Sequence, residues 1–456
     1  MESLLLTADH IVTMAPGNPV LTGHSVLVTG GRIAAVGPRA ELEAAHPAVK
    51  WRVLKNHVLM PGLVNAHCHS GLLRGTAEGQ PVWEWLRLFI DPMHRVLRPE
   101  EAEIASWLCY AEALLSGTTT LVDMWRFMHG SARAAEALGL RVVLVPYVGE
   151  HPSYNYFETL DTNEQLINDW HGKAGGRIHV WVGLEHMFYA VPAAWRRAAE
   201  MSRRYRVGFH THSNESHFDV EETLRRHGVR PIEALEAHGL LDSHRVLIAH
   251  AVWLSEQEIA ILAGRRVAVA HNPISNMKLA SGIAPVEQLL AAGVAVGVGT
   301  DGEKENNNLD MFEEVKVASL LAKLKALNAA ALDSWDALRM GTILGAQALG
   351  LDGEIGSVEV GKRADLIAVR SDTPRMTPLL VGEHLNLHHN LVHAVRGGDV
   401  SLTMVDGRIV VDEGRLLSAD LADLIARANL AVPPLLARRA EWLRTTAGAS
   451  TPITYA

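Results

Sequence analysis

The sequence predicts an α/β protein built on a (β/α)8 TIM barrel, with a small β-sandwich domain formed by both chain ends. Three observations support this prediction. Apolar, β-branched runs recur through the middle of the chain, a helix-like stretch follows them, and each run ends in a polar or ionisable residue. Continuous apolar runs suit strands buried on both faces of a parallel sheet, and their alternation with helices is typical of α/β folds.

Eight such runs can be counted, which is the strand number of a closed barrel. They end at His67 and His69, Asp123, Glu150, His186, His212, His250, His271 and Asp301. The helices expected between them include EEAEIASWLCYAEALLS, AAWRRAAEMSRRY and PVEQLLAAG. Because reactive side chains of such barrels gather at the carboxyl ends of the strands, we expect these polar residues to share one rim. A doubly wound open sheet is the competing fold.

The two flanks of the chain differ from the middle and predict short strands joined by turns. Gly30-Gly31 separates SVLVT from RIAAVG, and Asp406-Gly407 separates SLTMV from RIVVD. Both dipeptides are hairpin signals. We therefore assign residues 1–59 to the first part of the β-sandwich, 60–356 to the barrel, and 357–456 to the second part of the sandwich with terminal helices.

Composition and charge exclude several classes of protein. Of 456 residues, 48% are hydrophobic and 20% are charged, which is typical of globular domains and argues against a disordered or fibrous chain. With 42 basic and 51 acidic residues and no basic block, we expect no nucleic acid partner. No apolar stretch approaches the ~20 residues of a membrane helix. Glu2 and the lack of a basic n-region argue against a secretory signal.

Two cysteines, Cys68 and Cys109, are too few for a disulfide framework. A reducing cytoplasm is therefore the default expectation for its location. The oligomeric state is not readable from the sequence, and a homo-oligomer is one possibility.

Several residues expected on the rim have the chemistry of metal ligands. In His67-Cys68-His69, the two imidazoles are two residues apart on a strand and point to the same face. His212, His250 and Asp301 each end a strand of their own and share that rim. Imidazoles and a carboxylate with one open position are the ligand set of a catalytic Zn²⁺ or a similar divalent ion. Such an ion lowers the pKa of bound water to about 7.

Two further residues stand close to His212. Glu215 follows it by three residues in HTHSNE, where its carboxylate would overhang the ion without binding it, the placement needed to shuttle a proton. The alternative is a first-turn glutamate stabilised by a helix dipole. His210 shares the face of His212 but lies deeper in the strand, and we interpret it as a core histidine with satisfied hydrogen bonds.

The order of motifs resembles that of a known family. The motifs are His67-x-His69, HTHSNE, AHAVWL, AHNPISNMKLASGIAPV, GTDG, NNNLDMFEEVKVASLLAK and GSVEVGKRADLIAV. Together they resemble the amidohydrolase superfamily, and within it the branch of methylthioadenosine/S-adenosylhomocysteine deaminases and triazine hydrolases. The resemblance extends from about residue 5 to about residue 412.

The resemblance implies a metal site and the residues around it. It implies one divalent ion, Zn²⁺ or alternatively Fe²⁺ or Mn²⁺. The implied ligands are His67, His69, His212 and Asp301. The groups implied in proton transfer and water orientation are Glu215, His250 and Asp301. The implied substrate contacts are His186, beside the heterocycle, and Glu84, on its far side. Binuclear relatives carry a carboxylated lysine at the end of the fourth strand, and RIHVWVGLEH contains none.

The resemblance also implies the reaction, the hydrolytic removal of an amino group from a nitrogen heterocycle with release of ammonia. An adenosine-like nucleoside or a purine-type base is the first expectation for the substrate. The alternatives are an s-triazine amino- or chlorohydrolase, a pterin- or guanine-type deaminase, and a non-catalytic structural barrel. The last is disfavoured, because a scaffold would not need the complete set of metal and proton-transfer residues.

The chain departs from this branch at two places. Relatives that act on methylthioadenosine or S-adenosylhomocysteine bring arginines from the stretch after the third strand, where this chain has Pro146 and Thr159. The segment VPYVGEHPSYNYFETLDTNEQL contains no lysine or arginine, which favours a neutral substrate, with Tyr154 and Tyr156 nearby. The segment Glu303-Lys304-Glu305 is also more charged than the small residues usual there. The exact substrate is therefore left open.

Overall fold

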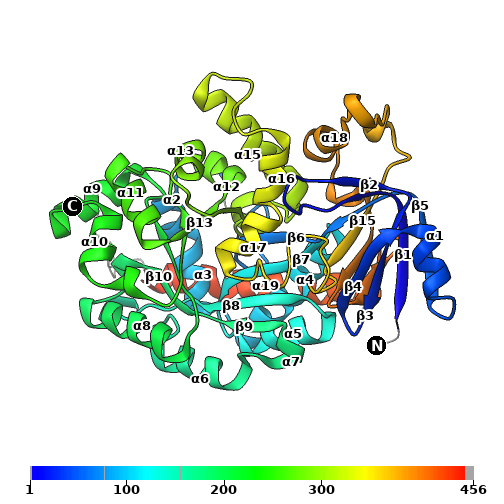
Figure 1. Ribbon diagram of the computed structural model, residues 1–456. Coiled ribbons are helices and arrows are strands. Elements are labelled where there is room, and N and C mark those ends of the chain that lie inside the picture. Colours follow the sequence, from blue (N-terminus) through cyan, green and yellow to red (C-terminus); the bar gives the residue numbers. More distant parts are fainter. Residues whose placement is uncertain (1–2, 77, 155, 447–456) are drawn as a thin grey trace.

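The computed structural model describes residues 3–76, 78–154 and 156–446 (Figure 1). Its centre is a ring of parallel strands in which consecutive strands pair with one another. The strands are β6 (Leu63–Cys68), β7 (Thr118–Trp125), β8 (Arg141–Pro146), β9 (Ile178–Val180), β10 (Val182–His186), β11 (Phe209–Ser213), β12 (Val246–His250), β13 (Ala268–His271) and β14 (Val296–Val298). Because β9 and β10 occupy one strand position, the ring has the eight positions that the sequence predicts.

The fourth strand position is divided where its hydrogen-bond partner changes. The Trp181 N–H donates to the Leu144 carbonyl of β8, at 2.9 Å, whereas the Val182 N–H donates to the Gly208 carbonyl before β11, also at 2.9 Å. β9 therefore pairs with β8 and β10 with β11, which connects the two halves of the ring.

The ring closes where β14 meets β6. The Asp301 N–H donates to the His67 carbonyl at 3.0 Å. A Cβ atom at Gly299 would lie 2.8 Å from the backbone N and O of His67, so the close approach at this seam requires glycine. The closed barrel is confirmed, and the open sheet is excluded.

The third strand ends earlier than the sequence predicts. β8 ends at Pro146, whereas we expected it to extend to about Glu150. Pro146 has no N–H with which to continue the ladder, and the Val148 N–H donates back to the Pro146 carbonyl at 2.9 Å. The chain therefore turns away from the barrel and forms a wall above the rim.

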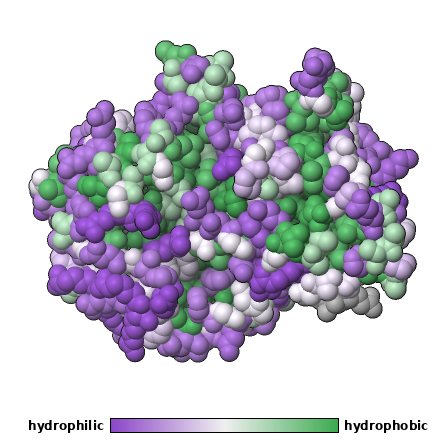
Figure 2. Space-filling view, in the orientation of Figure 1, coloured by the Kyte–Doolittle hydropathy of each residue, from purple (hydrophilic) through white to green (hydrophobic). Residues whose placement is uncertain are grey.

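Helices cover the outside of the barrel. The longer ones are α4 (Pro99–Leu115), α5 (His129–Leu138), α6 (Leu160–Trp170), α8 (Pro192–Tyr205), α9 (His217–His227), α10 (Pro231–Ala237), α11 (Glu256–Arg265), α15 (Met311–Ala326), α16 (Ser334–Met340) and α17 (Ile343–Leu349). Short helices near the rim or between strands are α2 (Val82–Trp85), the π-helical turn η1 (Leu86–Ile90), α3 (Asp91–Val96), α7 (Lys173–Gly176), α12 (Pro273–Lys278), α13 (Val286–Ala291) and α14 (Glu303–Asn306). Figure 2 shows hydrophilic residues over α6 and α8, as expected for amphipathic helices that face solvent.

The N- and C-terminal parts of the chain contribute to one nine-stranded sheet that lies beside the barrel (Figure 1). Its strands are β1 (Leu4–Val12), β2 (Val20–Thr22), β3 (His24–Thr29), β4 (Arg32–Pro38), β5 (Lys50–Pro61), β15 (Leu366–Arg370), β16 (Val400–Val405), β17 (Arg408–Asp412) and β18 (Arg415–Leu416). The N- and C-terminal parts join where β5 pairs with β15, and both predicted hairpins, β3–β4 and β16–β17, are present. The β-domain made from both ends is confirmed, and its strands are hydrogen-bonded into one continuous sheet around an apolar core that includes Leu6, Leu59 and Leu366.

Three helices belong to the end segments: α1 (Arg39–Ala45), α18 (Leu387–His393) and α19 (Leu421–Thr446). The last is continuous through Pro433 and Pro434. Leu424 and Ala428 of α19 pack against Ile104 on the outside of α4. Within the described ranges, no helix combines the length and the apolar composition needed to cross a membrane.

Candidate active site

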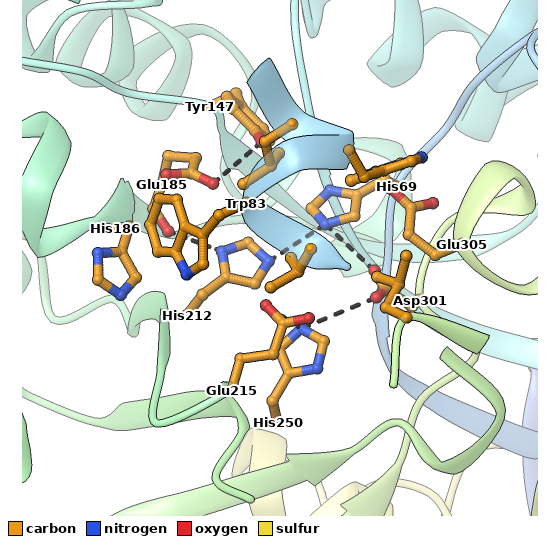
Figure 3. A pocket seen from close by; sticks show the side chains of 14 residues that line it. His69, Trp83, Tyr147, Glu185, His186, His212, Glu215, His250, Asp301 and Glu305 are labelled. Atoms are coloured by element: carbon orange, nitrogen blue, oxygen red, sulfur yellow. Dashed lines mark hydrogen bonds and ion pairs between the residues drawn. The ribbon is translucent and has the colours of Figure 1, made fainter. Parts of the chain in front are cut away.

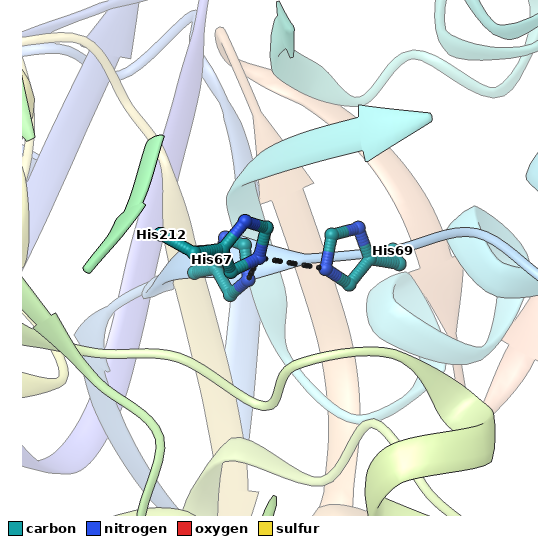
Figure 4. Close-up of side chains that lie close together, drawn as sticks. All are labelled: His67, His69 and His212. Carbon is teal, nitrogen blue, oxygen red and sulfur yellow. Dashed lines mark hydrogen bonds between the residues drawn. The ribbon is translucent and has the colours of Figure 1, made fainter. Parts of the chain in front are cut away.

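Four buried side chains converge at the carboxyl ends of the barrel strands. His67 and His69 lie at the end of β6 and His212 lies in β11 (Figure 4), and Asp301 follows β14. The Nε2 atom of His212 lies 3.2 Å from the Nε2 atoms of both His67 and His69. The Oδ1 atom of Asp301 lies 3.3 Å from the same two nitrogens of His67 and His69. The structure thus brings together the four ligands that the sequence resemblance implies.

Backbone carbonyls behind the site determine which nitrogen of two histidines carries the proton. His69 Nδ1 lies 2.6 Å from the Met124 carbonyl, and His212 Nδ1 lies 2.7 Å from the Glu185 carbonyl. Because a carbonyl can only accept, each Nδ1 atom carries the hydrogen. The Nε2 lone pairs of His69 and His212 therefore point into the site.

His67 is oriented through a second histidine. His210 Nδ1 donates to the Leu247 carbonyl at 2.8 Å, so His210 Nε2 accepts. His67 Nδ1 donates to that nitrogen at 2.8 Å, which leaves the lone pair of His67 Nε2 free. His210 is thus a buried histidine with both ring nitrogens hydrogen-bonded, as we predict from its depth in the strand.

The donor set fits a divalent cation. Burial, followed by the charges of neighbouring histidines, lowers the pKa values of His69 and His212 well below their usual range. Burial also lowers the pKa of His67, against the opposing effect of Asp301. Three lone pairs and a carboxylate oxygen about 3 Å apart repel one another unless a cation lies between them, and the hydrogen bonds behind them are those of metal-bound histidines.

Further side chains offer ligand atoms near the same point. Among the described residues, three groups have ligand atoms within 4.8 Å of one another. They are His67, His69 and His212; His67, His250 and Asp301; and His69, Asp301 and Glu305.

His250 and Asp301 are both held in left-handed backbone conformations, with φ values of 72° and 57°. This conformation costs about 1–3 kcal/mol for a residue other than glycine, and it occurs where surrounding contacts enforce it. The side chains of both residues are also held by hydrogen bonds: Asn276 Oδ1 lies 2.9 Å from His250 Nδ1, and Ser275 Oγ donates to Asp301 Oδ2 at 2.7 Å. His250 Nε2 then faces Asp301 Oδ2 at 3.8 Å and Glu215 Oε2 at 3.7 Å.

Glu215 lies beside this cluster and is held from behind. Its backbone N–H donates to Asp219 Oδ2 at 2.8 Å, and Ser281 Oγ donates to its Oε1 atom at 3.3 Å. Burial raises the pKa of Glu215 well above the usual range, and the negative charges of Asp219 and Asp301 add to the shift. A carboxyl group with a raised pKa next to candidate metal ligands suits a proton carrier.

The cluster forms the floor of a pocket (Figure 3). The other lining residues are Val82, Trp83, Trp85, Leu86, Tyr147, Glu185, His186, Glu215, His250, Leu279 and Glu305. His186 lines this pocket, as its predicted role requires. Its Nδ1 atom accepts from the Phe188 N–H at 3.2 Å, so its Nε2 atom carries the hydrogen.

Glu84 does not line the pocket itself. Glu84 lines a separate outer groove, which shares Val82, Trp83 and Leu279 with the pocket. Trp83 lines both spaces, and its indole N–H donates to Asp219 Oδ1 at 2.7 Å. Trp125 is buried and donates to the Ala102 carbonyl at 3.1 Å, so it is a packing residue.

Two acidic residues of the pocket, Glu185 and Glu305, are not among the site residues predicted from the sequence. Glu185 stands directly before His186 at a strand end, a position that by itself is not distinguishable from an ordinary strand residue. Glu305 belongs to the unusually charged segment Glu303-Lys304-Glu305, which was the available signal. All three of these residues are buried, and the Lys304 ammonium lies 3.1 Å from Glu305 Oε1.

Comparisons with known proteins agree with this geometry. The sequence model of the amidohydrolase family matches residues 58–410, and the model of an imidazolonepropionase-like composite domain of bacteria matches residues 26–48. A 5-methylthioadenosine/S-adenosylhomocysteine deaminase of Syntrophomonas wolfei is 39% identical over 82% of this chain and 86% of its own length. A 5'-deoxyadenosine deaminase of Methanobrevibacter smithii is 36% identical over 90% and 93%.

The fold is also that of a solved relative. The crystal structure of an adenosine deaminase from Xanthomonas campestris with bound zinc superposes with a TM-score of 0.88, at 31% identity, covering 95% of this chain and 98% of that one. Since the family match spans most of the chain and the relatives align over almost their whole length, the chain belongs to the amidohydrolase family.

Proposed function

We propose that this chain is a metal-dependent aminohydrolase that deaminates an amino-substituted nitrogen heterocycle, an adenosine-like nucleoside or a purine-type base, with release of ammonia. The observation that carries the proposal is the convergence of three neutral imidazoles and Asp301 beside Glu215 on the floor of one pocket. The names of the relatives, which are deaminases of adenine nucleosides, support it.

His67, His69, His212 and Asp301 would hold one divalent ion. Zinc is favoured, because the Xanthomonas structure has zinc bound. A single ion is favoured because β10 ends without a lysine that could be carboxylated. When bound, such an ion supplies Lewis-acid activation of water at neutral pH.

The residues of the chain would move the protons of the reaction. Glu215 would accept one proton as the water oxygen bonds to the ring carbon, and would deliver it to the ring nitrogen, where it stays in the product. His250 Nε2, with its Nδ1 atom held by Asn276, would orient the water, and Asp301 Oδ2 would accept the second proton of the water and pass it to the departing amino group. The carbon–nitrogen bond breaks, ammonia leaves, and the ring keeps the oxygen.

Two residues would orient the substrate. His186 lines the pocket, and its Nε2–H group would donate to an acceptor on the heterocycle. Burial lowers the pKa of His186 to about 4, so the imidazole is neutral at physiological pH. Glu84, in the outer groove, would contact polar groups of the part of the substrate that extends past Trp83.

A substrate panel tests this function. Purified protein with its metal content measured would be assayed for ammonia release from adenosine, 5'-deoxyadenosine, adenine, guanine, a pterin and amino-s-triazines. We expect the adenosine-like compounds and purine bases of the panel to release ammonia at rates proportional to the metal content of the protein. A protein that binds metal but releases no ammonia from any heterocycle would overturn it in favour of a structural barrel.

A further inference from the structure

One wall of the pocket carries a carboxylate with an unused oxygen. Glu185 is only 4% exposed and lines the pocket at the end of β10. The Tyr147 hydroxyl donates to its Oε1 atom at 3.1 Å, whereas its Oε2 atom is buried and has no hydrogen-bond partner. Figure 3 shows Glu185 beside Tyr147, facing the space above His212. A buried oxygen without a donor destabilises the free protein, and a bound ligand with a donor group would remove that cost.

The other carboxylates of the pocket already have partners. Asp301 accepts from Ser275 at 2.7 Å, Glu215 accepts from Ser281 at 3.3 Å, and Glu305 is paired with Lys304 at 3.1 Å. No lysine or arginine is among the described residues that line the pocket. The lining is therefore rich in carboxyl groups, and among the described lining residues Glu185 is the one whose carboxyl has a buried oxygen without a hydrogen-bond partner.

The neighbouring residue has the opposite hydrogen-bonding character. His186 also lines the pocket, and its ring hydrogen is on Nε2, because its Nδ1 atom accepts from the Phe188 N–H. Its nearest carboxylate oxygen, Asp219 Oδ2, is 4.0 Å from Nε2, beyond hydrogen-bonding distance. Consecutive residues of one strand thus offer an acceptor and a donor to the same ligand.

Glu185 also lies beside the candidate metal ligands. Its backbone carbonyl binds His212 Nδ1 at 2.7 Å, and the ring of its partner Tyr147 lies 5.7 Å from the ring of His69. A group that meets the Glu185 carboxylate is therefore close to the reacting ring. A sugar attached to that ring would extend away from the floor, towards Trp83 and the outer groove.

We propose that Glu185 is a specificity-determining residue that accepts a hydrogen bond from a second N–H donor of the heterocycle, distinct from the amino group that is hydrolysed. This inference rests on the proposed function and narrows its substrate class to amino-heterocycles with a further amino group or N–H on the six-membered ring that is hydrolysed, such as diaminopurines or diaminotriazines. The six-membered ring of adenine, apart from its amino group, offers only acceptors and a C–H group, which would leave Glu185 Oε2 unsatisfied.

The wild-type enzyme gives the first test. We expect kcat/KM for 2,6-diaminopurine to exceed that for adenine by about 10-fold or more, and the same ratio for their ribosides, because a site built around a substrate N–H discriminates against an analogue that lacks it. Equal rates for both members of each pair would overturn the inference. The 2'- and 3'-deoxy ribosides of both bases would be assayed as well. If kcat/KM depended on the sugar hydroxyls and not on the second amino group, the inference would also be wrong.

The Glu185→Gln variant gives the second test, with nearly the same shape. The amide oxygen would take the Tyr147 hydroxyl bond, so the amide NH₂ would face the pocket as a donor. We expect the ratio of kcat/KM for the diamino compound to kcat/KM for the monoamino compound to fall by about 10-fold or more. The change should come mainly from KM of the diamino compound, and the metal content should be retained. The control E221Q changes an exposed glutamate of α9 and should leave the ratio unchanged.

The outcomes separate the two proposals. If wild type deaminates heterocycles and E185Q keeps its metal with an unchanged ratio, the role of Glu185 is wrong and the proposed function stands. If wild type releases ammonia from none of these compounds, both proposals fail. If E185Q does not fold, the wild-type ratio alone still decides the inference.

Discussion

At the scale of single residues, the site depends on hydrogen bonds that lie behind the groups that react. Each candidate ligand histidine has its Nδ1 hydrogen bound to a buried acceptor, so its Nε2 lone pair does not need to be reoriented when a cation binds. Partners of this kind typically contribute 10–100-fold in metal affinity. Met124 and Glu185 supply them through backbone carbonyls, which a substitution of either side chain would not remove.

The His67→Ala variant should lose metal and activity together. His67 contributes one of the four converging ligand atoms, and its removal also leaves His210 Nε2 without its hydrogen-bond donor. We expect the metal content per chain and the turnover number to fall in parallel when both are measured on the same preparation. His384→Ala, at a histidine whose side chain is 75% exposed, is the control and should change neither. Full metal occupancy in the His67 variant would contradict the assigned ligand set.

The Glu215→Gln variant should separate metal binding from proton transfer. Glutamine keeps the shape and can still accept from Ser281, but it cannot carry the proton. We expect kcat to fall by about 10²-fold or more with the metal content unchanged, the usual scale for a positioned acid or base. Metal analysis beside steady-state kinetics checks this prediction. If the metal were lost, Glu215 would be a ligand and its assignment as a proton carrier would be wrong.

The sequence could predict the residues that converge but not all of those that line the pocket. His67, His69, His212 and Asp301 are recognisable because each stands at the end of an apolar run, and the barrel topology brings strand ends together. Glu185 is not recognisable in this way. Alternation along a strand would place it on the opposite face from His186, and only the irregular end of β10 lets both line the pocket.

At the scale of elements, the segment after β8 shows that the charges around a segment cannot be predicted from its own residues alone. The stretch contains no lysine or arginine, but cations reach it from elsewhere. The Arg95 guanidinium of α3 lies 3.8 Å from the centre of the Tyr156 ring, and Arg126 Nε lies 3.9 Å from Glu158 Oε1. Neither arginine is among the described lining residues of the pocket. The described lining of the pocket therefore contains no lysine or arginine, although two arginines from other elements contact residues of this segment.

The same wall predicts a preference for neutral substrates. Among the residues that line the pocket, four carboxylates and no described lysine or arginine would face an anionic tail. An ion removed from water without a partner costs several kcal/mol. We expect kcat/KM for adenosine or another neutral amino-heterocycle to exceed that for S-adenosylhomocysteine by about 10-fold or more, which corresponds to about 1.4 kcal/mol. Side-by-side ammonia-release assays check this, and S-adenosylhomocysteine as the better substrate would contradict it.

At the scale of the whole molecule, the barrel and the sheet from the chain ends are joined by a buried ion pair. Arg141, at the start of β8, donates from Nε to Asp365 Oδ2 at 2.8 Å and from its terminal nitrogen to Oδ1 at 3.1 Å. Asp365 precedes β15 and also accepts from the Asp406 N–H at 2.7 Å. The hairpin at Asp406-Gly407 was predictable from its turn residues. Its attachment to the barrel was not, because it depends on residues more than two hundred positions apart.

Asp365→Ala should therefore destabilise the entire chain. The substitution leaves the Arg141 guanidinium buried between barrel and sheet without a partner, and breaking a buried pair in this way costs about 3–5 kcal/mol. The matched control is Glu43→Ala, which breaks the exposed Arg39–Glu43 pair of α1 and should cost about 0.3–0.5 kcal/mol. Urea unfolding followed by circular dichroism measures both free energies. A cost for Asp365→Ala as small as that of the control would mean that water reaches Arg141 and that the sheet does not depend on this pair for its position against the barrel.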